Sequence, residues 1–245
     1  MNAVSATFLR ELRAYFFSPL AYVVLFFLLV ANGVIFAIIV GYLNDPLAPA
    51  GRPFDFFFNN FVFWAMQLFG APVLTMRLLA EERRSGSIEV LMTAPVTEGQ
   101  VVAGKYLAAF VFYLFLWLPT VAYAVVIDRF GDVDWGTIAA GYLGIALVGA
   151  LFLSIGVFGS ALSKNQIVAA IITFALNLLV FMIVFLTNLV NDPKLKDLLA
   201  HLSIAEHMDE FSKGIVDTRR LVFYLSATLF FLWVASRTLE DKKWR

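Results

Sequence analysis

Six apolar runs, each long enough to cross a bilayer, constrain this chain more than any other feature of its sequence. A helix needs about 20 apolar residues to cross a hydrocarbon core of ~30 Å, and it satisfies its own backbone polar groups. Charged residues occur only near the ends of the runs, where long side chains can reach water. The sequence therefore predicts an all-α, polytopic membrane protein forming one domain over 1–245. The expected spans are 20–40, 57–79, 104–127, 137–161, 167–190 and 220–237.

Composition agrees with this class and excludes several others. Hydrophobic residues make up 61% of the chain and charged residues 15%, against about 25% charged in soluble domains. The net charge is zero, so nucleic acid is not an expected partner, and the absence of Cys excludes disulfides and thiol chemistry. The first run is longer than the ~7–15 residues of a signal peptide and lacks an A-x-A cleavage site, so we expect it to be a retained span.

Two catalytic or transport classes find little support in the spans. Ion-coupled transport usually needs ionisable residues inside the membrane, and none lies deep in a run. The polar residues at depth are expected to form hydrogen bonds between helices; they are Asn32, Gln67, Thr173 and Asn177. An intramembrane serine protease would need a base near Ser160, but both histidines, His201 and His207, lie in a loop outside the spans.

The N-terminal segment 5–18 is amphipathic. One helical face is apolar and the other is charged. The apolar face holds Phe8, Leu9, Leu12, Tyr15 and Phe16, and the charged face holds Arg10, Glu11 and Arg13. This pattern favours a helix in the membrane interface, broken from the first span by Ser18-Pro19; the alternative is a simple extension of that span.

Orientation follows from Lys and Arg. With the N-terminus inside, eleven of the 18 basic residues fall on the inner side and seven on the outer side. The excess predicts that both termini are cytoplasmic, in a multi-pass protein of the cell inner membrane.

Two further regions carry interpretable patterns. The fourth expected span holds many small residues, which predicts close packing within the bundle or against another subunit. The exterior loop 191–219 has two apolar stripes whose register changes near Ser203, so we expect two short amphipathic helices, the second ending at Gly214.

The segment 80–101, between the second and third spans, is the most charged interior stretch. Breaks at Gly86 and Pro95 define a short element, Ile88 to Thr93, whose apolar side chains the loop is too small to bury. An exposed apolar element beside charged residues indicates a docking site for another protein. The alternative is that these side chains rest on lipid or on neighbouring helices.

This segment resembles the signature of type-2 ABC exporter permeases, an E-x-x-x-G-[ST]-x-E-x-L core, a Pro-Val turn, and Gly-Lys at the next span. The residues that match are Glu82, Gly86, Ser87, Glu89, Leu91, Pro95, Val96, Gly104 and Lys105. The Thr that commonly follows the glycine is Ser87 here. A late stretch is similar to the gliding-motility-associated branch of that superfamily, and the residues that match it are His207, Phe211, Lys213, Gly214, Ile215 and Asp217.

The resemblance implies a non-catalytic permease subunit that pairs with a second copy or a paralogous permease. It implies two ATPase subunits docked on the segment 80–101, which would act as a cytoplasmic coupling helix. The chain has no G-x-x-x-x-G-K-[ST] motif, so ATP and Mg²⁺ are expected on the partner subunit and no cofactor in this chain. Membrane lipid and a periplasmic accessory protein are further expected partners.

The sequence leaves three candidate functions to compare. The first is export driven by ATP hydrolysis on partner subunits. The second is a mechanical or regulatory complex that acts on a periplasmic partner without a transported substrate, as the gliding-motility resemblance implies. The third, a stand-alone secondary transporter, is disfavoured by the absence of charge deep in the spans.

Overall fold

The computed structural model describes residues 3–44, 53–85, 97–131, 133–190 and 192–241, and within these ranges the chain is helical without a strand. Six helices are long and apolar enough to span a membrane, which confirms the predicted all-α membrane fold. The helices are α1 (Ala3–Phe16), α2 (Pro19–Leu43), α3 (Pro53–Asn59), α4 (Phe61–Thr75), α5 (Ala80–Ser85), α7 (Glu98–Trp117), the 3₁₀ turn η1 (Leu118–Thr120), α8 (Val121–Asp128), α9 (Trp135–Leu162), α10 (Gln166–Phe181), α11 (Ile183–Leu189), α12 (Pro193–Leu202), α13 (Ile204–Ser212) and α14 (Thr218–Asp241).

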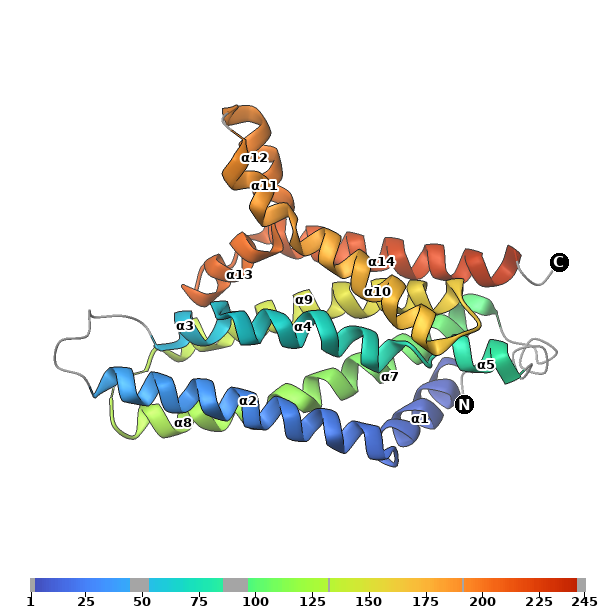
Figure 1. The fold of residues 1–245 in the computed structure, drawn as a ribbon, viewed down its shortest axis with the longest axis horizontal. Helices are drawn as coiled ribbons and strands as arrows, with labels where there is room; N and C mark the ends of the chain where they lie inside the picture. Colours follow the sequence, from blue (N-terminus) through green and yellow to red (C-terminus); the bar gives the residue numbers. More distant parts are fainter. Residues whose placement is uncertain (1–2, 45–52, 86–96, 132, 191, 242–245) are drawn as a thin grey trace.

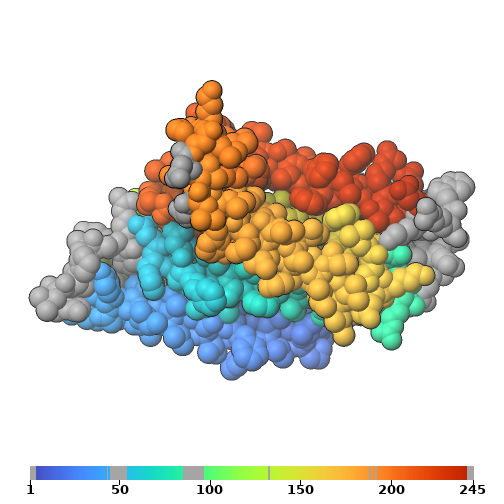
Figure 2. Space-filling model, turned by 45° about the horizontal axis from the view of Figure 1, so that its top comes forward, coloured from blue at the N-terminus to red at the C-terminus, as the bar shows by residue number. Residues whose placement is uncertain are grey.

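The spans form an elongated bundle around α9, the most buried of them (Figure 1). This helix contacts α4, α7, α10, α13 and α14. At one end of the bundle lie α1, α5 and the end of α14, and at the other lie α3 and α8, while α11 and α12 project away from it (Figure 1). One face presents α10, α4 and α2 side by side (Figure 2).

Small residues on α9 allow this packing, as the sequence predicts. A Cβ on Gly141 would lie 2.2 Å from the Phe58 ring, and one on Gly149 would lie 2.2 Å from the Tyr113 ring. Gly156 is equally close to Thr75 of α4. The small residues therefore serve contacts within this chain, from three different elements.

Several helices are interrupted where the sequence suggests one continuous span. Asn60 separates α3 from α4, and its side chain accepts a hydrogen bond from the Phe63 N–H as the cap of α4. Pro119 lies in the 3₁₀ turn between α7 and α8, where it cannot supply an N–H for an α-helical hydrogen bond. The fifth span turns at Met182, between α10 and α11.

The N-terminal helix is separate from the first span. α1 ends at Phe16, and Pro19 is the first residue of α2. The apolar face of α1 packs on protein, above all on α7: the Tyr15 ring stacks on Phe112 at 5.0 Å, and the Tyr15 hydroxyl donates to the Leu74 carbonyl at 2.5 Å. That α1 also lies in the membrane interface stays a prediction.

The prediction of hydrogen bonds between helices is right for two of the four polar residues at depth, Gln67 and Asn32. Gln67 accepts from the Tyr113 hydroxyl at 2.8 Å. The Asn32 amide donates to the Met66 sulfur of α4 at 3.6 Å, and also to the Leu28 carbonyl of its own helix. The Thr173 hydroxyl instead donates to the Ala169 carbonyl, one turn back in its own helix. Asn177 is buried with no hydrogen-bond partner among the described residues.

The packing around α9 leads to a first prediction. Gly149→Ala places a methyl group against the buried Tyr113 ring, and we expect a loss of about 1–3 kcal/mol in the free energy of unfolding from overpacking. Gly41→Ala on α2 is the matched control, because its Cβ meets open space. Unfolding of both variants in detergent checks this, and equal stability of the two would contradict the packing account.

Candidate functional site

Four charged side chains from α1, α5 and α7 meet at one end of the bundle. The Lys105 Nζ lies 2.8 Å from Glu11 Oε1 and 2.8 Å from Glu82 Oε1. The Arg10 Nη2 lies at the same distance from each of these two oxygens. We call these four residues the Lys105 cluster. Two cations and two anions alternate in it, so its formal charge is zero.

Lys105 corrects an expectation from the sequence. Its position near the end of a predicted span indicates a side chain that reaches water, but only 1% of it is exposed. α7 begins at Glu98, ahead of the expected span 104–127, because Thr97 and Gln100 form a capping box there. Lys105 therefore lies two turns inside the helix, where α1 covers it.

Gly104 allows α1 to lie against α7 at this point. A Cβ on Gly104 would approach the Thr7 Cβ to 2.8 Å and the Val4 carbonyl oxygen to 3.0 Å. Gly104 and Lys105 thus serve one contact: the glycine lets the helices approach, and the lysine pairs with Glu11 of α1.

The electrostatics show why the cluster holds together. Burial raises the pKa of the Glu11 carboxyl, but Lys105 and Arg10 outweigh it, so the pKa lies below its usual value. Burial lowers the pKa of Arg10, but the Glu11 and Glu82 carboxylates raise it by more, so the pKa of Arg10 lies above its usual value. Removing one member would leave the cluster with a net charge beside buried Lys105, which costs more than losing an exposed ion pair.

The start of α5 is fixed separately to α9. The Ser160 Oγ accepts hydrogen bonds from the Leu79 N–H at 3.0 Å and the Ala80 N–H at 3.1 Å, and it donates to the Met76 carbonyl. Arg83 donates to the Ala161 carbonyl at 2.5 Å. Ser160 therefore satisfies backbone groups at the turn between α4 and α5, a role unlike that of a nucleophile.

Most of the predicted docking residues lie outside the described ranges. These are Gly86, Ser87, Glu89, Leu91 and Pro95, together with the expected helix Ile88 to Thr93. Glu82 is described, and it belongs to the Lys105 cluster.

The predicted exterior motif forms the corner between α13 and α14. His207 and Phe211 are fully buried, and the His207 Nδ1 lies 3.3 Å from the Tyr224 hydroxyl. Gly214 has φ +83°, and a Cβ there would lie 2.9 Å from the Thr137 hydroxyl. The Asp217 side chain accepts from the Arg219 N–H at the start of α14. Each of the four motif residues thus has a packing, turn or capping role.

An ion pair closes the same corner. The Arg220 guanidinium makes two hydrogen bonds to Glu210, at 2.9 and 3.0 Å. These bonds hold the pKa of the Glu210 carboxyl below its usual value. Burial, helped by the charge of Arg220, lowers the pKa of His207 to about 4. Histidine is therefore neutral here, inside a corner held by a charged pair.

Sequence reasoning missed the partners of the cluster. It placed Arg10 and Glu11 on the polar face of an interfacial helix, without a protein contact. The available signal was complementary charge: one Arg and one Glu on α1, a Glu on α5 and a Lys beside a glycine on α7. Among the described residues, no group of His, Asp and Glu could hold a metal ion.

A bundle of six apolar helices with a charge-paired end defines a multi-pass membrane protein. The family model described as ABC-2 family transporter protein matches residues 49–204, so the chain belongs to that family. No curated protein matches the chain.

A second prediction concerns the cluster. Glu82→Gln removes one of the two carboxylates that balance buried Lys105, and we expect the free energy of unfolding to fall by about 1–3 kcal/mol. Glu240→Gln is the control, because its partner Arg237 is exposed and such pairs contribute only ~0–1 kcal/mol. Chemical unfolding in detergent distinguishes them. A loss in Glu82→Gln no larger than in the control would mean that the cluster is not stabilising.

A third prediction concerns pH. The folded protein keeps His207 neutral down to about pH 4, whereas an unfolded chain protonates it near pH 6.5. Its contribution to stability is therefore complete above pH 6.5 and is lost as the pH falls toward 4. We expect the melting temperature to fall less over this range in His207→Gln than in the unsubstituted protein. Parallel melting profiles for the two proteins would contradict the assignment.

Proposed function

We propose that this chain is the permease subunit of an ATP-driven exporter, in which partner ATPases act on the segment between α4 and α7. In this proposal two ATPase subunits bind the segment 80–101, and a second permease copy or a paralogue completes the pathway. The family supports a permease in general. The Lys105 cluster is the observation that carries the coupling proposal.

The cluster supports coupling because both ends of that segment are held to the bundle. On one side, Glu82 of α5 pairs with Lys105, and Ser160 of α9 holds the preceding turn. On the other side, α7 begins at its Thr97 cap and carries Lys105 itself. A displacement of residues 86–96 would then be transmitted to α1, α5 and α7 together, because the ion pairs join these three helices.

The charge balance also supports an energy source outside this chain. Lys105 is the one Lys or Arg among the described residues that is almost fully buried, and two carboxylates neutralise it. A neutralised, structural lysine is unsuited to carrying an ion across the membrane. We therefore propose that ATP and Mg²⁺ bind the partner subunits and that this chain is non-catalytic.

The arrangement of charges suggests the orientation. α1, α5 and the end of α14 lie at one end of the bundle (Figure 1), and this end carries the excess of Lys and Arg. We propose that it faces the cytoplasm, so that both termini are cytoplasmic in the cell inner membrane.

A fourth prediction tests docking. Glu89→Ala and Leu91→Ala each remove a proposed contact, and we expect each to lower co-purification of the ATPase at least severalfold. Glu240→Ala, at the same end of the bundle, is the control. Unchanged association in both segment variants would contradict the docking proposal.

A second candidate function is a mechanical or regulatory complex that acts on a periplasmic partner. The observation that favours it is α12, which projects from the bundle and leaves Leu195, Leu198 and Leu202 exposed (Figure 1). Replacing these leucines with Ser should release a co-purifying periplasmic chain if this function is correct. Cargo export that persists in the same variant would favour the exporter.

A further inference from the structure

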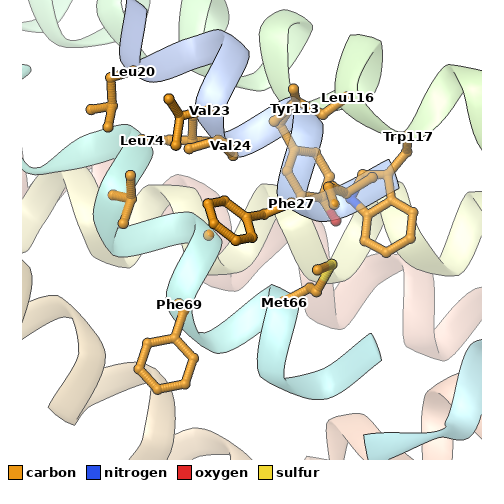
Figure 3. A pocket seen from close by; sticks show the side chains of 13 residues that line it. Leu20, Val23, Val24, Phe27, Met66, Phe69, Leu74, Tyr113, Leu116 and Trp117 are labelled. Carbon is orange, nitrogen blue, oxygen red and sulfur yellow. The ribbon is translucent and has the colours of Figure 1, made fainter. Parts of the chain in front are cut away.

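An apolar groove of about 370 Å³ lies between α2, α4 and α7, where nothing so far assigns a function. Figure 3 shows its lining, with Phe27 of α2, Met66 and Leu74 of α4, and Trp117 of α7 around the cavity. Phe27 is 62% exposed, so the groove opens on the surface of the bundle rather than being enclosed. In a membrane, that surface meets lipid.

The groove has the depth of one leaflet. On α2 its lining runs from Leu20 to Leu28, and on α4 it runs from Leu74 back to Met66. Each stretch rises ~12 Å along its helix, close to half of a ~30 Å hydrocarbon core. Leu20 and Leu74 lie near the α1 end of their helices, so the groove extends from that end of the bundle toward the middle of the membrane.

A cation lies at the α1 end of the groove. A small adjoining cavity shares Leu20, Val24 and Leu74 with it and reaches Tyr15 and Arg77. The Arg77 guanidinium lies 4.8 Å from the centre of the Tyr15 ring, and its Nη1 donates to the Ser18 hydroxyl at 3.1 Å. Within the described ranges no carboxylate lies at ion-pair distance from Arg77.

This combination favours a particular occupant. Lys105, on the neighbouring α7, has two carboxylates, whereas half-buried Arg77 has only neutral contacts among the described residues. A second copy packed into the groove would have to bring a carboxylate to Arg77. A phospholipid supplies both requirements at once: an acyl chain for the apolar lining and an anionic phosphate for the guanidinium.

We propose that the groove binds one acyl chain of an anionic phospholipid, in the leaflet at the α1 end, with its headgroup phosphate at Arg77. Tyr15 and Ser18 position the guanidinium, and the lipid packs between the first span and the α4–α7 pair. The proposal goes beyond the exporter function, since it requires neither ATPase nor cargo and is measured on this chain alone.

The chain offers a variant that fills the groove and a matched control. Gly70 lines the groove, and a Cβ there meets nothing within 4 Å. Gly70→Leu therefore occupies the space of the acyl chain without a clash at its Cβ. Gly41 of α2 has equally open surroundings but is not part of the lining, so Gly41→Leu controls for the added side chain.

The headgroup contact has its own pair of variants. Arg77→Gln removes the charge, while Arg77→Lys keeps it. Arg129→Gln removes an exposed cation at the opposite end of the bundle, beyond α8, and so controls for net charge.

The experiment places the purified chain in nanodiscs of phosphatidylcholine with a minor fraction of phosphatidylglycerol that carries a diazirine in its acyl chain. Photolysis products are then mapped by mass spectrometry. We expect adducts concentrated on the groove residues of α2 and α4, reduced in Gly70→Leu and unchanged in Gly41→Leu. Arg77→Gln should reduce the adducts about fivefold. This factor corresponds to the ~1 kcal/mol that one basic residue contributes to binding near an anionic surface. Arg77→Lys and Arg129→Gln should retain them.

Three outcomes would overturn the proposal. The first is labelling spread evenly over the exposed faces of α2 and α14. The second is equal labelling by a phosphatidylcholine probe that does not respond to Arg77→Gln. The third is a groove without adducts in which the Phe27→Cys variant cross-links two copies, which would identify a second copy as the occupant. If Gly70→Leu does not fold, the comparison of Arg77→Gln with Arg77→Lys still tests whether the groove binds an anionic lipid.

Discussion

The pairing of Lys105 with two carboxylates is the interaction on which one end of this molecule depends. An ammonium group that is almost wholly buried in a membrane-spanning helix requires counter-charges, and these come from Glu11 and Glu82. To supply them, α1 must lie on α7, and α5 must bring Glu82 to the same point. Gly104 allows the approach. One electrostatic requirement thus fixes the position of three helices.

At the opposite end, an ion pair again joins two helices, and both of these helices pack on α9. Arg220 and Glu210 join α14 to α13, and Phe211 packs against Gly144 of α9. Arg77 is the contrast, because its half-buried charge finds only neutral partners among the described residues. The two paired sites hold helices of this chain together, whereas Arg77 lies where a lipid phosphate can supply the missing charge.

The sequence alone predicts the six spans and the helical class, because length and continuous hydrophobicity determine both. It also predicts that the α9 glycines allow close packing, but it does not predict which side chains pack against them. It does not predict the Lys105 cluster, since Arg10 and Glu82 are 72 residues apart and Glu11 and Lys105 are 94 apart. Amphipathic spacing in α1 identifies an apolar face, but it cannot distinguish a face that packs on α7 from one that meets lipid.

If the Lys105 cluster couples α5 to α7 energetically, a double-mutant cycle on Glu82 and Lys105 measures the coupling energy. Glu82→Gln, Lys105→Met and the double variant are unfolded in detergent under identical conditions. We expect a coupling energy of at least about 1 kcal/mol between the two positions, because each single variant leaves the other charge inadequately balanced. Additive losses, with a coupling energy near zero, would contradict it.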